Sequence, residues 1–148
     1  MDNSNAQSLT GFRATRGYGA GEVLKLDEPV SFWGGVGLDG SIIDVHHPQH
    51  TISVTGRVLV MNSGRGSSSG TYSFAELIRA DLAPAAIVMT EPDAIVALGA
   101  MVAGEMYQKY IPILVVSESD YALIRNGQHA VVDAPVTAEN GTLTLSLS

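Results

Sequence analysis

The sequence predicts an α/β fold, a layered β/β/α domain with a central parallel sheet, antiparallel strands and helices on one face. The middle of the chain alternates strand-like and helix-like segments, an order that favours parallel strands joined by right-handed crossovers. The flanking segments are strand-like, some with alternating polarity. The 148 residues fit one domain with one core, because 45% are hydrophobic and only 16% are charged.

The first part of the chain predicts strands without helices. Residues 1–10 are expected to form a flexible N-terminal tail, and the folded domain is expected to occupy residues 11–148. Glycines within residues 17–21 indicate a turn between the first two strands, and Asp39-Gly40 is a turn signal before the third. Strands are expected over residues 11–15, 22–26, 41–45 and 57–61.

The second part of the chain predicts alternating helices and strands. Phe74, Leu77 and Ile78 have the i, i+3, i+4 spacing of one helical face, and this helix is expected to end at residues 81–84. Pro92-Asp93 is expected to open an apolar helix. Further strands are expected over residues 85–89, 113–116, 128–133 and 143–147, and further helices over residues 94–106 and 119–125.

The composition argues against several classes of protein. With 15 acidic and 8 basic residues, the net charge is −7, which disfavours nonspecific binding to nucleic acid or to an anionic membrane. The chain has no cysteine, so it lacks thiolates for a disulfide, an iron–sulfur cluster or a structural zinc, and no metal site is expected on it. No signal peptide or membrane-spanning run is recognisable, so we expect a cytoplasmic protein.

Residues 62–70 form a glycine- and serine-rich segment between a predicted strand and a predicted helix. A helix N-terminus offers unpaired N–H groups and the positive end of the helix dipole, which bind carboxylate or phosphate. The serines 67–69 could instead be ordinary helix caps. The segment has neither the P-loop spacing nor the dinucleotide-binding fingerprint. The residues alone therefore indicate an anion-binding loop and leave its role open.

Several short blocks of the sequence carry a resemblance to a known family. The blocks are Ser31-Phe32-Trp33-Gly34-Gly35-Val36, Ile42-Ile43-Asp44 with His47-Pro48, Ser63-Gly64-Arg65-Gly66-Ser67-Ser68, Ala83-Pro84-Ala85-Ala86-Ile87-Val88 and Ile111-Pro112-Ile113. In this order, over about residues 11–116, they resemble the aconitase X swivel domain. The resemblance implies a swivelling β/β/α domain. It also implies the small subunit of a dehydratase, a hydro-lyase that is active only as a heterodimer with its large subunit.

In that family the large subunit holds an iron–sulfur cluster and most substrate contacts, while the swivel domain supplies a serine as general base. The first serine after Gly-Arg-Gly has this role, which implies Ser67 here. The implied reaction is elimination of water from a hydroxy acid. The serine removes the proton alpha to a carboxylate, and the partner's iron acts on the leaving hydroxyl as a Lewis acid.

The same motif implies the substrate-binding residues of this chain: Gly64, Arg65, Gly66 and Ser68. Related aconitases have an arginine after Gly-Ser-Ser, whereas this chain has Ser69 there. Arg65 or the large subunit must therefore supply the cation that binds the substrate carboxylate.

The resemblance favours cis-3-hydroxy-L-proline as substrate, because Phe-Trp-Gly-Gly-Val and Asp-Val-His-His-Pro resemble the bacterial members. Mevalonate 5-phosphate, the substrate of archaeal members, is the alternative. A non-catalytic anion-binding or regulatory module is a further interpretation. A phosphohistidine carrier is disfavoured, because residues 62–70 contain no histidine.

Two other clusters have competing interpretations. His46, His47 and His50 are candidate metal ligands, but Pro48 prevents a helix there, so a structured loop or a partner contact is favoured. Phe32 and Trp33 are interpreted as core residues or as contacts at a subunit interface.

Overall fold

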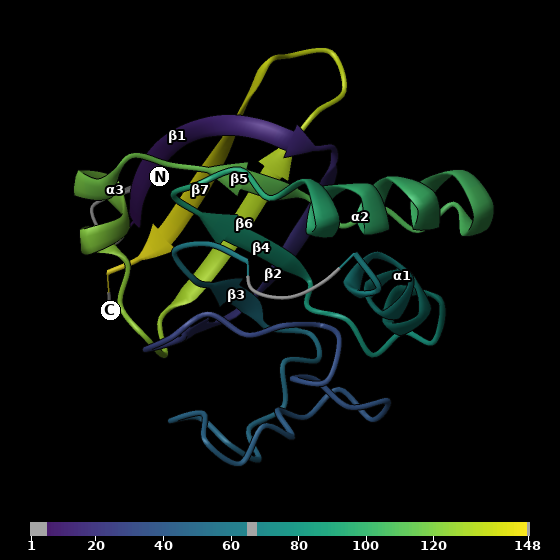
Figure 1. The fold of residues 1–148 in the computed structure, drawn as a ribbon. Helices are drawn as coiled ribbons and strands as arrows, with labels where there is room; N and C mark the ends of the chain where they lie inside the picture. Colours follow the sequence, from purple (N-terminus) through teal and green to yellow (C-terminus); the bar gives the residue numbers. More distant parts are fainter. Residues whose placement is uncertain (1–5, 65–67, 148) are drawn as a thin grey trace.

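The computed structural model describes residues 6–64 and 68–147, and its strands close into one barrel in the order β1-β5-β4-β3-β2-β6-β7 (Figure 1). The strands are β1 (Ala6–Thr15), β2 (Gly17–Lys25), β3 (Val58–Val60), β4 (Ala86–Met89), β5 (Ile113–Val115), β6 (His129–Ala134) and β7 (Asn140–Ser146). The helices are α1 (Gly70–Arg79), α2 (Ala94–Tyr107) and α3 (Glu118–Leu123).

The predicted α/β class is confirmed, with parallel and antiparallel strands joined in a single sheet. Strands β2, β3, β4 and β5 run parallel to one another, and the antiparallel strands β1, β6 and β7 close the sheet. Helices α1 and α2 pack together on one side of the barrel (Figure 1). Helix α3 lies apart from them, and its Tyr121 packs into the core inside the barrel.

The alternation of side chains in the short parallel strands divides the core into two parts. In β3, Val58 and Val60 point into the barrel, whereas Leu59 points outward toward Phe74 and Leu77 of α1. All three strand residues are fully buried. Strands covered on both faces therefore appear as continuous apolar runs in the sequence.

One expected boundary and one expected strand are wrong. Strand β1 begins at Ala6 and not at Gly11, because it pairs with β7 along its length, from Ala6 opposite Ser146 to Phe12 opposite Asn140. The expected tail at residues 1–10 therefore overlaps the sheet from residue 6 onward. The expected strand at residues 41–45 is also absent. The chain folds back on itself there, with Ile42 hydrogen-bonded to Ile52 and Thr51, and only isolated bridges form.

The glycines at 17, 19 and 21 lie within β2 and do not form the expected turn. A Cβ atom at Gly19 would lie 2.0 Å from the carbonyl oxygen of Ala85, and one at Gly21 would lie 2.3 Å from that of Gly56. These glycines are thus explained by the close approach of another backbone segment.

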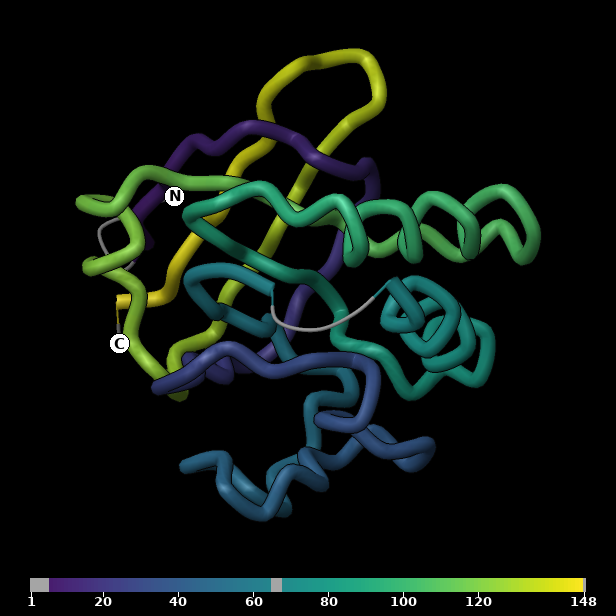
Figure 2. The backbone as a smooth tube through the Cα atoms, viewed as in Figure 1, coloured from purple at the N-terminus to yellow at the C-terminus, as the bar shows by residue number. Residues whose placement is uncertain are grey.

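Between β2 and β3 the chain leaves the barrel, and residues 26–57 form a long excursion that passes beneath α1 (Figure 2). Phe32 attaches this excursion to the helix, since its ring centroid lies 4.4 Å from that of Phe74. Among the described helices, none is both long and apolar enough to cross a membrane.

Candidate functional site

The predicted functional loop follows β3 at the carboxyl end of the parallel strands, where it meets the loop that follows β4. The carbonyl oxygen of Asn62 joins the two loops. It accepts hydrogen bonds from the backbone N–H groups of Thr90 and Glu91, at 3.0 and 3.1 Å, and from the Thr90 hydroxyl at 3.0 Å. Ligand sites of α/β proteins lie at this edge of a parallel sheet.

Gly64 lies against the side chain of Asp93, the residue that caps α2. Asp93 accepts a hydrogen bond at Oδ1 from the backbone N–H of Val96, at 3.0 Å. A Cβ atom at position 64 would lie 1.6 Å from its other oxygen, Oδ2. Only glycine fits at 64 without displacing this cap. The N-terminus of α2 is therefore occupied by the chain's own carboxylate.

Among the residues that the structure describes, none caps the N-terminus of α1 in this way. Ser69 stands at the N-cap position with a helical φ of −62° and ψ of −20°, and its side chain makes no capping hydrogen bond. The first turn of α1 contains no acidic residue. Of the two helix termini at this edge, α1 is the one whose N–H groups and dipole are not already neutralised by a carboxylate cap.

A side-chain contact ties the two helices together close to the loop. Thr71 Oγ1 donates a hydrogen bond to the carbonyl oxygen of Ile95, at 3.0 Å. Gly70 allows this approach, because a Cβ there would lie 3.2 Å from Ile95 Cγ2. Helices α1 and α2 are thus fixed relative to each other by direct contact close to Gly70.

The structure describes the two ends of the predicted site and not its centre. Gly64 is half-buried at one end and Ser68 is exposed at the other, where its carbonyl oxygen accepts from the Thr71 N–H. Arg65, Gly66 and Ser67 lie outside the described residues. Their expected roles stay predictions.

Sequence reasoning missed the residues that hold this loop, Asn62, Thr90 and Asp93. Asp93 was expected only to open a helix. A usable signal was present, because loops that follow neighbouring parallel strands meet at one edge of the sheet.

Among the three histidines of residues 46–50, His47 has partners for both of its ring nitrogens. His47 is buried, with Nε2 2.8 Å from the Glu28 carbonyl oxygen, and Nδ1 accepts from the Gln49 N–H at 3.0 Å. Nε2 therefore carries the proton and donates. Both ring nitrogens are engaged, so His47 is explained as a residue that secures the loop.

Phe32 and Trp33 have different environments. Phe32 is 3% exposed and belongs to the core, as one interpretation expected. Trp33 is 60% exposed. Its indole is thus available to a partner.

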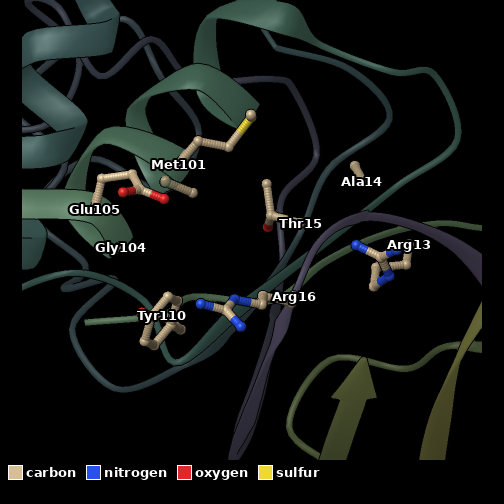
Figure 3. Close-up of a pocket in the computed structure, with 9 residues that line it drawn as sticks. Arg13, Ala14, Thr15, Arg16, Met101, Gly104, Glu105 and Tyr110 are labelled. Carbon is tan, nitrogen blue, oxygen red and sulfur yellow. The ribbon is translucent and has the colours of Figure 1, made fainter. Parts of the chain in front are cut away.

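A separate cavity of about 260 Å³ lies toward the other end of the parallel strands (Figure 3). Met101 and Glu105 of α2 lie on one side of it, and Arg16 lies on the other, 4.2 Å from the centroid of the Tyr110 ring. Thr15, which also lines it, pairs with Ile113 at the start of β5. The cavity is therefore distinct from the predicted loop.

Comparison with known proteins gives a consistent result. The family model described as the aconitase X swivel domain matches residues 8–145. Cis-3-hydroxy-L-proline dehydratase of Pseudomonas aeruginosa is 44% identical over 103 residues, which are 69% of this chain and 18% of that protein. The phosphomevalonate dehydratase small subunit of Thermococcus sibiricus is 39% identical over 127 residues, 85% of this chain and 92% of that one.

A solved structure agrees with these sequence matches. The crystal structure of Thermococcus kodakaraensis aconitase X in its holo-form superposes with a TM-score of 0.78 at 29% identity, covering 93% of this chain and 98% of that one. The chain spans about one fifth of the length of the hydroxyproline dehydratases that it matches, 18% of one and 20% of another.

Proposed function

This chain belongs to the aconitase X swivel domain family, and we propose that it is the small subunit of a heteromeric dehydratase, active only with a large subunit. The match of the family model to residues 8–145 carries the proposal. The absence of cysteine from the chain does not fit an iron–sulfur cluster held here, so any such cluster belongs to the large subunit. We place the complex in the cytoplasm, with a small hydroxy acid as its substrate.

The role proposed for Ser67 is that of general base in the elimination of water. Its oxygen, ionised to the alkoxide, would take the proton alpha to the substrate carboxylate and become a hydroxyl, while Gly64, Arg65, Gly66 and Ser68 bind the substrate. The described surroundings support this role. The uncapped N-terminus of α1 follows within three residues, and a helix N-terminus stabilises negative charge that forms near it.

We propose cis-3-hydroxy-L-proline as the substrate. The P. aeruginosa relative with that name is 44% identical to this chain, and the match extends over 69% of it. Mevalonate 5-phosphate is the second candidate. Its support is the separate small subunit of T. sibiricus, of which the chain covers 92%.

The test of the substrate proposal is a screen of the reconstituted pair of subunits with both compounds. Product formation from cis-3-hydroxy-L-proline alone would support the first candidate. Turnover of mevalonate 5-phosphate alone would overturn it in favour of the second.

The test of the catalytic proposal compares Ser67→Ala with Ser69→Ala. Both variants remove one hydroxyl from the same loop, but the Ser69 hydroxyl makes no capping hydrogen bond. We expect Ser67→Ala to lower kcat by several orders of magnitude while the subunits still assemble, and Ser69→Ala to stay within a few-fold of wild type. Full turnover by Ser67→Ala would contradict the proposal and favour a non-catalytic, anion-binding module.

A further inference from the structure

We propose that an apolar hollow between residues 32–43 and helix α1 is the surface on which the large subunit docks, with Trp33, Leu38 and Ile43 as its principal contacts. This inference rests on the proposed function in that it takes the large subunit as the partner. Nothing in the family match assigns these residues a role.

The hollow has a volume of about 310 Å³ and is lined by several large apolar side chains that are exposed to solvent. Trp33, Leu38 and Ile43 line it and are 60%, 84% and 47% exposed. Buried Phe32 and Leu77 line it as well. Large apolar groups that gather in one exposed place mark an interaction site more often than a solvated surface.

The composition around the hollow is that of the centre of a protein interface. Among residues 29–43 the sole charged side chain is Asp39. That carboxylate is engaged locally, since it accepts hydrogen bonds from the N–H and the hydroxyl of Ser41, which hold the pKa of Asp39 below its ordinary value. Interface centres are depleted of charge and enriched in aromatic residues, and tryptophan is over-represented among the residues that contribute most to binding.

Local hydrogen bonds keep the hollow in one conformation. Ser31 Oγ accepts from the Trp33 N–H at 3.0 Å and donates to the Trp33 carbonyl oxygen at 2.9 Å. The Ile43 N–H donates to the Gly35 carbonyl oxygen at 2.9 Å, which holds both sides of the excursion together. A surface that is already ordered loses little conformational entropy when a partner binds, so more of the contact energy appears as affinity.

The position of the hollow, beside the start of α1, favours the large subunit as its binding partner over other candidates. The backbone nitrogen of Trp33 lies 3.9 Å from the place where a Cβ of Gly70, the first residue of α1, would stand. The hollow therefore adjoins the end of the loop that carries Ser67. A chain that completes the active site at this loop has to cover the neighbouring surface. The single-chain relatives leave about four fifths of their length for that chain, since this one matches 18% and 20% of them.

The test measures the affinity of this chain for its purified large subunit, recognised by similarity to the part of the P. aeruginosa dehydratase that this chain does not match. The informative variants are Trp33→Ala and Leu38→Glu. Leu38 is 84% exposed, so a charge there leaves the free chain folded, which thermal denaturation verifies. The matched control is Met106→Glu, which puts the same charge at an apolar residue that is 64% exposed near the far end of α2.

We expect Trp33→Ala to raise the Kd at least about thirtyfold, as for the strongest contacts of other interfaces. Leu38→Glu should raise it more than tenfold, and Met106→Glu should stay within about twofold. Wild-type affinity in both test variants would overturn the inference, as would an equal loss in Met106→Glu. It would also fail if Leu38→Glu converted a dimer of this chain to monomers without weakening the complex. The assay records binding and not turnover, so its result is independent of the Ser67 role.

Discussion

The contact between Gly64 and Asp93 makes the substitution Gly64→Ala a sharp test of how the functional loop is held. The added methyl would lie 1.6 Å from Asp93 Oδ2 and 2.5 Å from Cγ, so the carboxylate must move. The backbone of Gly64 is outside the left-handed region, so alanine is allowed there by its φ. The cost is therefore the lost cap on α2, about 1–2 kcal/mol.

The expected change in melting temperature follows from the size of the protein. For a domain of about 150 residues, 1 kcal/mol corresponds to roughly 2–4 °C. We expect Gly64→Ala to lower Tm by about 2–8 °C in thermal denaturation followed by circular dichroism. We also expect a loss of turnover in the complex, because the displaced segment leads directly to Ser67.

A double-mutant cycle separates this explanation from a general loss of loop stability. Asp93→Ala removes both the cap and the atoms that the Gly64→Ala methyl would clash with, at the same cost of about 1–2 kcal/mol. The double variant should then be about as stable as Asp93→Ala alone. If the two effects add, or if Gly64→Ala is as stable as wild type, the contact does not hold the loop.

Two further predictions concern strand β2 of the barrel and Tyr121 of helix α3. Gly19→Ala should prevent stable folding or lower Tm by more than Gly64→Ala, because its Cβ would meet the Ala85 carbonyl oxygen at 2.0 Å, and backbone cannot rotate away as a side chain can. A Tm equal to that of wild type would show that β2 and the 85–86 segment are not in contact. Burial raises the pKa of Tyr121 above its ordinary value of 10.0, so its contribution to stability is fully present below pH 10 and is lost as the pH rises through the folded value. Tyr121→Phe should remove that part of the alkaline decline in urea-unfolding free energy, and an unchanged decline would contradict it.

Local sequence patterns predicted most of the helices and strands. Contacts between residues that are far apart in the sequence determine how these elements pack. The run Val58-Leu59-Val60 indicated a buried strand, which is confirmed, but its two-sided burial follows from closure of the barrel. The glycines of β2 indicated a turn, which was wrong. The close approach that explains Gly19 depends on the position of Ala85, in a different part of the chain. Residues 41–45 include the β-branched Ile42, Ile43 and Val45 and fit a strand, but they form only isolated bridges.

The same difference between local sequence patterns and distant contacts applies to the candidate site. The glycine–serine motif located the loop from the sequence, because glycines and a helix start are local features. The partners of the loop are not local. The carbonyl oxygen of Asn62 is held by residues 90 and 91, and Gly64 is explained by Asp93. Which side of the excursion remains exposed also depends on packing, so Phe32 and Trp33 are neighbours in the sequence with opposite burial.

The energetics of a serine base explain why this chain should need its partner. A helix N-terminus is worth up to about 2 kcal/mol to a nearby negative charge, which is a factor of about thirty in the equilibrium between hydroxyl and alkoxide. A serine base needs a far larger gain than one helix N-terminus supplies. The remainder must come from enclosure, because removing water strengthens every fixed dipole around the oxygen. The proposed docking surface adjoining the loop would provide that enclosure. The hollow lined by Trp33 and the proposed role of Ser67 are therefore linked: on both proposals, the subunit would become a catalyst only when that face is covered.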